Sequence, residues 1–584
     1  MNKRMITIES LKLFYSASPV IFIVIQSLTL LQGMMPFFSL IVFKTIIDKA
    51  SVSAGFDNSI LILSLFWTGT FILQYFSSIF NNSLREMLNR KTLLVMNNKI
   101  MDKTLSFQGI HNFEDKKYRE MERRLDFCSN MMPYFLHCFT DVSQYILQCV
   151  SVFFLFGSIG IWVPIAIIFS LIPTIFSQKK LANLDADFEE EISEIRIREM
   201  YLRRNAIDPR YAKEFRVFDF FSVFSKQYKS VQNDLYLITK RFQTKTIKFE
   251  FIGIFIRVII AGILLYYIFS KVSSVGSTVY TVGMLALYMQ SVFVFSDAFL
   301  QIANWNTEVT RALQTIKYFF EYMGYKDSIK ISDFPLPFNE EVKEIRFDKV
   351  SFSYDDRQIL KDISFSINTG DVLAIVGENG AGKTTLVKLL LRFYDVSSGT
   401  IYVNGVDITK YDIKQYRKKI SAVFQDFAKF ELTLKENILP DDESVLQPTE
   451  DRIDILGSSF YKTLSDGFHT MLGVEFGGRE VSGGEWQRIA ILRGLEKKSD
   501  IFIVDEPTAS IDPIQEAFIY EKIIKHASKI TILITHRLGS IKNAKKILVL
   551  KDGKLLAVDT HDTLINKCNY YAELYNSQAD MYKT

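Results

Sequence analysis

The chain has 584 residues, of which 48% are hydrophobic and 23% are charged. Its net charge of +4 is small for this length, so we expect no nucleic-acid partner. The mean hydropathy of +0.12 averages two unlike halves, because long Phe-rich apolar runs extend to about Asp297 and soluble α/β patterning begins after about Pro337.

The cysteines and the N-terminal segment exclude two further classes. No CxxC or CxH pair occurs among Cys128, Cys138, Cys149 and Cys568, so a metal or redox centre is not expected. Residues 1–20 lack the basic–apolar–small-residue pattern of a cleaved signal. We interpret them as a cytoplasmic lead-in to a first membrane span, with no Cys/His protease domain before it.

Six segments contain the roughly 20 apolar residues that a membrane-spanning helix needs. They are about 19–45, 59–82, 132–157, 161–178, 249–270 and 278–300. The links after the first, third and fifth are short, whereas those after the second and fourth are long, charged and helical in pattern. The first long link is rich in Lys and Arg, which places the long links and both termini in the cytoplasm. This alternation disfavours the competing interpretation of 59–82 as a buried soluble helix.

The pattern changes between about 318 and 344, where Pro335 and Pro337 make a continuing helix improbable. Strand-like runs then alternate with helical ones, which indicates an α/β domain with a largely parallel sheet. We therefore predict a helical, six-span transmembrane domain at 1–325, a linker at 326–342 and an α/β domain at 343–584.

A phosphate-binding motif opens the second domain. The run GENGAGKT fits GxxxxGK[ST] between a strand and a helix. Its glycines let backbone N–H groups approach phosphate oxygens, Lys383 supplies a charge for the β- and γ-phosphates, and the Thr384 hydroxyl is placed for Mg²⁺. The predicted ATP site comprises Gly377, Glu378, Asn379, Gly380, Ala381, Gly382, Lys383, Thr384 and Thr385.

Two acids follow the later apolar strand IFIVDE. Taken alone, two acids after an apolar strand are as often an ordinary strand end as a functional pair. Beside a phosphate loop, Asp505 is predicted to hold Mg²⁺ and Glu506 to polarise the attacking water. The second domain is thus expected to be a P-loop ATPase.

A second anion-binding pattern lies between these motifs. The run VSGGEWQR starts a helix with Ser482, Gly483, Gly484 and Glu485, and helix N-termini attract anions. One nucleotide does not need two anion-binding helix N-termini from the same chain, so the second one needs a separate explanation. With this motif the whole chain resembles the ABC transporter family, in its half-size exporter class. In the family signature Leu more often precedes the Ser and Gln often follows the second Gly, so this chain departs from it at Val481 and Glu485.

The resemblance implies roles for residues outside these motifs. Tyr354 matches the aromatic residue that stacks on adenine, with a plain strand-face tyrosine as the alternative. Asp512 matches an aspartate that contacts the partner subunit, and His536 matches a switch histidine near the γ-phosphate. The implied catalytic residues are Glu506, His536 and Gln425, and the implied Mg²⁺ ligands are Thr384, Gln425 and Asp505.

In this family one ATP lies between the phosphate loop of one subunit and the signature of the other. The resemblance therefore implies a partner half-transporter chain, with a homodimer favoured. It also places short coupling helices near 111–115 and 207–211. The run AKEFRVF at 212–218 is similar to bacterial peptide and lantibiotic exporters, although a solvated helix face would also explain it.

Ionisable residues at membrane depth usually face a cavity or a partner. Arg257 is the first candidate for a substrate path, followed by Asp297 and Asp141, either of which could instead pair with Arg257. The prediction is an ATP-hydrolysing exporter in a bacterial cytoplasmic membrane, in contact with lipids and carrying a bacteriocin-like peptide. Multidrug export, lipid or lipid-linked glycan flipping and, less favoured, a non-transporting ATP-gated sensor are the alternatives.

Overall fold

The computed structural model describes residues 3–52, 58–156, 162–274, 281–440, 449–506, 519–521, 530–535, 538–542 and 544–581. It divides into two compact units. Unit 1 comprises Met1–Thr104 and Arg119–Tyr325, and unit 2 comprises Leu105–Tyr118 and Lys326–Thr584. The three predicted domain ranges stay a prediction. They assign Leu105–Tyr118 to the membrane domain, whereas these residues pack within unit 2.

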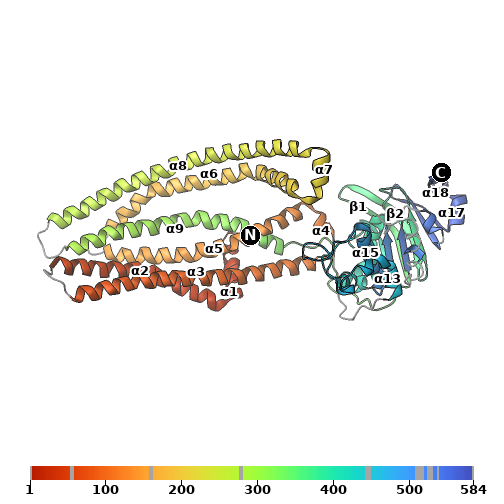
Figure 1. Ribbon diagram of the computed structural model, residues 1–584, viewed down its shortest axis with the longest axis horizontal. Helices are drawn as coiled ribbons and strands as arrows, with labels where there is room; N and C mark the ends of the chain where they lie inside the picture. Colours follow the sequence, from red (N-terminus) through yellow and green to blue (C-terminus); the bar gives the residue numbers. More distant parts are fainter. Residues whose placement is uncertain are drawn as a thin grey trace. The chain divides into compact units, whose positions relative to one another are not determined.

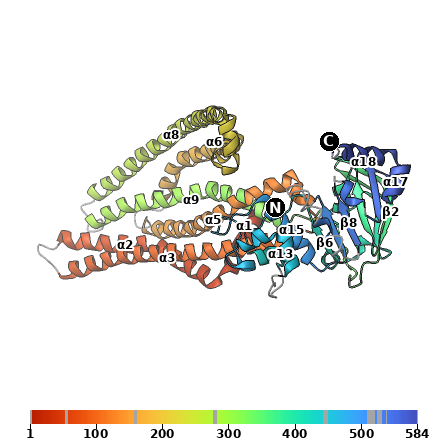
Figure 2. The ribbon, with the colours of Figure 1, turned by 45° about the vertical axis from the view of Figure 1, so that its right-hand side comes forward.

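Unit 1 consists of long helices (Figure 1). Those described are α1 (Lys3–Ala17), α2 (Pro19–Val52), α3 (Asn58–Ser106), α5 (Lys116–Leu155), α6 (Trp162–Ile207), η2 (Pro209–Tyr211), α7 (Ala212–Val217), α8 (Phe220–Ser274) and α9 (Val282–Met323). Helices α6 and α8 run side by side with α7 near one end, and α2 packs against α9 (Figures 1 and 2). The described residues of the six predicted spans lie on α2, α3, α5, α6, α8 and α9.

Several described helices of unit 1 are apolar and long enough to cross a membrane. Four stretches qualify by length and composition within the described residues: Pro19–Ser51, Asn58–Ser106, Met131–Leu155 and Val282–Met323. Helix α3 alone has 49 residues, which corresponds to about 74 Å at the helical rise, against a hydrocarbon layer of about 30 Å. Such helices extend well beyond a bilayer, so the long charged links are continuations of the spanning helices.

A buried arginine joins two of these helices. Arg85 on α3 is only 5% exposed, and its guanidinium forms an ion pair of 2.7 Å with Asp141 on α5. The Arg85 Nη1 atom also lies 3.2 Å from Nδ1 of His137, one turn away on α5. Asp141 therefore has a cation partner on α3, whereas its predicted pairing with Arg257 stays a prediction. The side chain of Arg257 is outside the described part of the structure, and Asp297 is exposed on α9.

Unit 2 contains two sheets in its described residues. The first has the order β2-β1-β4-β5 and is antiparallel, and the second has the order β10-β9-β3-β8-β7-β6 and is parallel from β9 to β6. The strands are β1 (Glu344–Tyr354), β2 (Arg357–Asn368), β3 (Val372–Val376), β4 (Ser398–Val403), β5 (Val406–Asp407), β6 (Ile420–Val423), β7 (Ile501–Asp505), β8 (Ile530–Ile534), β9 (Lys546–Lys551) and β10 (Lys554–Asp559). Strands β7 and β8 are buried at every position, as expected for central parallel strands.

Helices cover the parallel sheet and bury its apolar faces. They are α10 (Lys383–Leu390), η3 (Ile408–Lys410), α11 (Ile413–Lys418), α12 (Leu434–Ile438), α13 (Glu450–Leu456), α14 (Ser458–Lys462), η4 (Gly467–His469), α15 (Gly483–Glu496), η5 (Leu538–Ile541), α17 (His561–Lys567) and α18 (Asn569–Met581). One core cluster joins α10 to β3 and β8, and another joins α12–α15 to β7. This packing fixes the strand ends that position the site.

The segment Leu105–Tyr118 contributes a short helix to unit 2. Helix α4 (His111–Glu114) coincides with the first predicted coupling helix. Glu114 forms an ion pair of 3.3 Å with Lys388 and accepts a hydrogen bond from the Tyr394 hydroxyl. The Arg417 guanidinium donates to the Gln108 carbonyl at 2.8 Å, and its burial lowers the pKa of Arg417 to about 10. These charge-assisted contacts explain why the segment joins this unit.

Candidate nucleotide-binding site

The carboxyl ends of four neighbouring strands meet at one edge of the parallel sheet. Strand β3 leads into the phosphate loop at Gly377, β6 leads to Gln425, and β7 ends at Asp505, next to Glu506. Strand β8 lies between β3 and β7. Motifs separated by more than a hundred residues therefore share one edge, which is where ligands bind in open α/β sheets.

A pocket of about 440 Å³ opens at this edge. It is lined by Arg357, Ile359, Asn379, Gly380, Gly382, Lys383, Thr384, Thr385, Gln425 and Glu506. The structure thus brings together most of the predicted phosphate loop, the predicted base Glu506 and Gln425, which is an implied Mg²⁺ ligand. Of the other loop residues, Gly377 and Glu378 contact the pocket residue Lys383, because their carbonyl groups accept hydrogen bonds from its side chain.

Backbone geometry requires glycine at two positions of the phosphate loop. Gly377 has a φ of 154°, and a Cβ there would lie 2.3 Å from the carbonyl oxygen of Leu550 on β9. Gly382 has a φ of 103° and starts α10, so its conformation turns the helix N-terminus toward the pocket. The loop is a backbone cradle for an anion, as the motif predicts.

Lys383 is the cation of this cradle. Its ammonium group donates to the Gly377 carbonyl at 2.8 Å and to the Glu378 carbonyl at 3.0 Å. Burial lowers the pKa of Lys383, while the nearby carboxylates of Glu506 and Asp505 oppose that shift. The side chain is only 6% exposed, so its charge acts in a poorly hydrated place, where a phosphate is a favourable partner.

Asp505 has the properties of a ligand for a divalent cation. It is 2% exposed, and its Oδ1 atom is buried without a hydrogen-bond partner among the described residues. Burial raises the pKa of Asp505 to about 6, although the Thr384 hydroxyl donates to the carboxylate and lowers it. An unpartnered buried carboxylate oxygen beside a hydroxyl and the amide of Gln425 fits Mg²⁺, which uses few protein ligands together with phosphate oxygens.

Glu506 is held in an unusual backbone conformation. Its φ is 47°, which a non-glycine residue rarely adopts, and its N–H donates to the carbonyl of Ile534 at 2.9 Å. The Gln425 side chain donates to the Glu506 carboxylate at 3.1 Å. Strand β8 and Gln425 therefore hold the Glu506 carboxylate at the pocket that would contain the γ-phosphate of ATP.

Tyr354 and Arg357 lie at the two ends of one tight turn. They pair across the turn between β1 and β2, yet only Arg357 lines the pocket. The Tyr354 ring packs edge-on against Phe352 and Tyr394, with centroids 4.8 and 5.2 Å away. The sequence analysis missed Arg357. The signal was the two-residue turn, which implies that residue 357 faces the same region as residue 354.

The remaining predicted residues are not among the described residues that line this pocket. Asp512 and His536 lie outside the described residues. Ser482, Gly483, Gly484 and Glu485 start α15 and are absent from the described lining of the pocket. The described lining of the site therefore includes a phosphate loop and a base but no residue of the signature.

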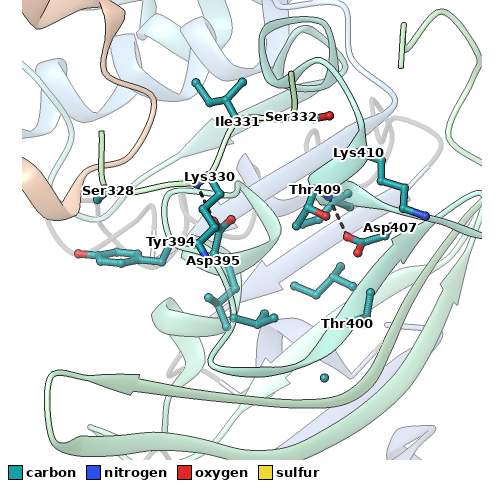
Figure 3. Close-up of a pocket in the computed structure, with 15 residues that line it drawn as sticks. Ser328, Lys330, Ile331, Ser332, Tyr394, Asp395, Thr400, Asp407, Thr409 and Lys410 are labelled. Atoms are coloured by element: carbon teal, nitrogen blue, oxygen red, sulfur yellow. Dashed lines mark hydrogen bonds between the residues drawn. The ribbon is translucent and has the colours of Figure 1, made fainter. Parts of the chain in front are cut away.

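A second pocket in unit 2, of about 590 Å³, has different chemistry (Figure 3). It is lined by residues 328–332 and by residues around β4 and η3. Its acids are already engaged: Asp395 accepts from the Lys330 N–H at 3.0 Å and Asp407 from the Thr409 N–H at 2.8 Å. No phosphate loop contributes to its described lining, so the nucleotide belongs in the smaller pocket.

Comparisons with known proteins agree with this geometry. Residues 360–509 match the family model described as ABC transporter. The subtilin transport ATP-binding protein of Bacillus subtilis is 26% identical over 588 residues, an alignment covering 98% of this chain and 94% of that protein. The nisin transport ATP-binding protein of Lactococcus lactis is 34% identical, over 57% of each chain.

The fold is shared with a solved transporter. A bacterial Atm1-family ABC exporter with ATP bound superimposes with a TM-score of 0.80 at 21% identity, over 96% of this chain and 98% of that one. That likeness supports the predicted combination of a helical six-span domain and a P-loop ATPase domain. Residues 360–509 therefore carry the ATPase domain of the ABC transporter family, and over nearly its whole length the chain is similar to half-size exporters, in which ATPase activity is coupled to transport across a membrane.

Proposed function

We propose that two copies of this chain form an exporter with two composite ATP sites and that its cargo is a peptide. The observation that carries the dimer is the incomplete pocket, which has a phosphate loop and a base but no signature in its described lining. A second chain would present Ser482 and its neighbours to the bound ATP. Closing two such sites is the step that would move the membrane helices between inward-open and outward-open states.

Exposed apolar side chains support the same assembly. Around η2 and α7, where the second coupling helix is predicted, Ile207 is 74% exposed, Val217 75% and Phe218 69%. A group of large apolar side chains at the tip of a long hairpin is typical of an interaction surface. We propose that this tip contacts the ATPase unit of the partner chain, with α4 as the other contact that couples hydrolysis to transport.

The chemistry follows from the pocket residues. Lys383 and the N–H groups of the phosphate loop bind the phosphates, and Asp505, Thr384 and Gln425 would hold Mg²⁺. Mg²⁺ would neutralise charge on the β- and γ-phosphates. Glu506 polarises a water molecule for attack on the γ-phosphorus, with ADP as the leaving group. Tyr354 would stack on adenine, Asp512 would contact the partner, and His536 would sense the γ-phosphate.

The peptide cargo rests on two observations. The aligned relatives are named for subtilin and nisin transport, and one alignment spans nearly the whole chain. The stretch that resembles peptide exporters forms its own short helix, α7. We place the chain in a bacterial cytoplasmic membrane with both termini and unit 2 inside, on the basis of the charged long links. Asp297, Asp141 and Arg257 are the proposed contacts of the path, and Asp141 would act together with Arg85.

The cargo is tested by measuring ATPase activity in proteoliposomes against peptides, lipids and drugs side by side. We expect a peptide, such as one encoded beside this gene, to raise hydrolysis several-fold and to accumulate in inside-out vesicles with ATP. If lipids or drugs stimulate and peptides do not, the peptide assignment is wrong and flipping or multidrug export replaces it. A well-folded chain with negligible ATPase activity under every condition would instead favour a sensor.

Arg357 is expected to contribute to nucleotide binding. It lines the pocket opposite the phosphate loop, so its loss should remove one charge-assisted contact with ATP. We expect Arg357→Ala to raise KM for ATP about fivefold to tenfold, with kcat changed little. Arg346→Ala on β1, whose guanidinium stacks on Tyr402 outside the pocket, is the matched control. Equal KM values in Arg357→Ala and the control would show that Arg357 does not contact the nucleotide.

A further inference from the structure

The signature of this chain carries a negative charge that the family pattern lacks. Glu485 stands where Gln often follows the second glycine, in the first turn of α15. In the proposed dimer this turn faces the triphosphate of an ATP bound by the other chain. A carboxylate there would repel the γ-phosphate and cancel part of the attraction of the helix N-terminus for anions.

Glu485 is fixed in this first turn by a reciprocal pair of hydrogen bonds. Its Oε2 atom accepts from the Ser482 N–H at 2.7 Å, and its own N–H donates to the Ser482 hydroxyl oxygen at 3.4 Å. This capping box stabilises the start of α15. It also ties the charge of Glu485 to the serine that is proposed to meet the γ-phosphate.

Arg479 is the cation that meets this carboxylate. Its Nη2 atom lies 3.4 Å from Oε1 of Glu485, the oxygen that the capping box leaves available, and both side chains are about three-quarters buried. The two carboxylate oxygens of Glu485 therefore have different partners: Oε2 accepts from the Ser482 N–H, and Oε1 pairs with the Arg479 guanidinium.

The position of Arg479 does not depend on Glu485. The guanidinium stacks 4.6 Å from the ring of Phe460, which is 4% exposed, and donates to the Phe460 carbonyl at 3.2 Å. Its backbone is held as well, because the Arg479 N–H donates to the Met471 carbonyl at 2.9 Å and its carbonyl accepts from the Gly473 N–H at 2.8 Å. A cation anchored in this way is pre-organised to offset the charge of Glu485.

We propose that Arg479 is a charge-compensating positioning residue, which lets Glu485 cap the signature helix without repelling the ATP of the partner chain. The inference rests on the proposed composite site. In this role Arg479 does not contact the nucleotide and acts through Glu485. Removing the Arg479 side chain leaves the Glu485 carboxylate in place, because the hydrogen bond from the Ser482 N–H remains. The uncompensated carboxylate would then repel the γ-phosphate of the partner's ATP.

The test is a double-mutant cycle on kcat/KM for ATP in the reconstituted full-length chain. Arg479→Ala is expected to lower kcat/KM about tenfold, mainly through KM, in the native background. In the Glu485→Gln background the same substitution should change kcat/KM by less than about twofold, because no charge is left to compensate. Arg479→Lys, which keeps the charge, should recover most of the loss.

A matched control separates this role from a structural one. Arg452 and Glu496 form an ion pair of 2.7 Å at the other end of α15, so Arg452→Ala removes an Arg–Glu pair from the same helix without touching the signature. We expect its kcat/KM to stay within about twofold of wild type. Thermal unfolding of each variant reports any loss of fold.

The outcomes are distinguishable. A tenfold loss for Arg479→Ala that persists in the Glu485→Gln background would overturn the inference, because the arginine would then act by holding Phe460 and the loop. So would the absence of any loss in the native background. A wild-type chain without ATPase activity would overturn the proposed function itself, and this inference with it.

Discussion

Replacing Glu506 with Gln is expected to leave ATP binding close to wild type and to reduce steady-state hydrolysis by about 10²–10⁴-fold. The carboxylate is aimed at the pocket by the bond from its N–H to Ile534 and by the Gln425 side chain. The amide keeps the size and hydrogen-bonding capacity of the side chain, but it cannot accept a proton from the attacking water. The measurements are ATP binding to the purified chain and phosphate release.

Glu573→Gln is the control for this prediction, because Glu573 is an exposed carboxylate on α18 and lies apart from the pocket lining. It should hydrolyse ATP at the wild-type rate. Substantial hydrolysis by Glu506→Gln would mean that another group acts as the base. Loss of ATP binding in this variant would mean that the residue is structural.

Lys383→Ala is expected to weaken ATP binding about a hundredfold, or about 2.7 kcal/mol, with hydrolysis lost in proportion. The ammonium group is 6% exposed, and its present partners are two carbonyl groups, Gly377 and Glu378. It can exchange these neutral acceptors for phosphate oxygens without moving far. Titration of a fluorescent ATP analogue measures the loss.

Lys554→Ala on the exposed strand β10 removes a lysine from the same unit and should bind the analogue as wild type does. Unchanged binding by Lys383→Ala would contradict the assignment of the pocket. In that case the second pocket in unit 2, which also has lysines in its lining, would have to be tested as the nucleotide site.

The sequence predicted the parts of the site that depend on short motifs at strand ends. Lys383, Asp505 and Glu506 follow apolar strands of a parallel sheet, and the carboxyl ends of such strands meet at one edge whatever the loops between them do. The long charged links were likewise readable as helices that extend the spans. At the strand-end motifs and in the long links, the local sequence pattern is therefore sufficient to predict the structure.

Contacts between side chains that are distant in the sequence could not be predicted in the same way. Asp141 pairs with Arg85 because α3 and α5 bring them together, and neither hydropathy nor spacing indicates that partner. The compensation of Glu485 by Arg479 depends on the stacking of Arg479 on Phe460, which only the packed core reveals. Periodicity also does not say which core a loop joins, and Leu105–Tyr118, which lie in the predicted membrane-domain range, pack within unit 2.

The placement of Leu105–Tyr118 has a consequence for the order of synthesis. The ribosome makes this segment before most of α5 and before α6, α8 and α9. Lys388, Tyr394 and Arg417, with which the segment packs, are made after all four helices. The ATPase unit is therefore assembled from two stretches of chain made at different times. Its last contacts close only after the helices of unit 1 have been synthesised, so the ATPase unit is completed at the end of translation.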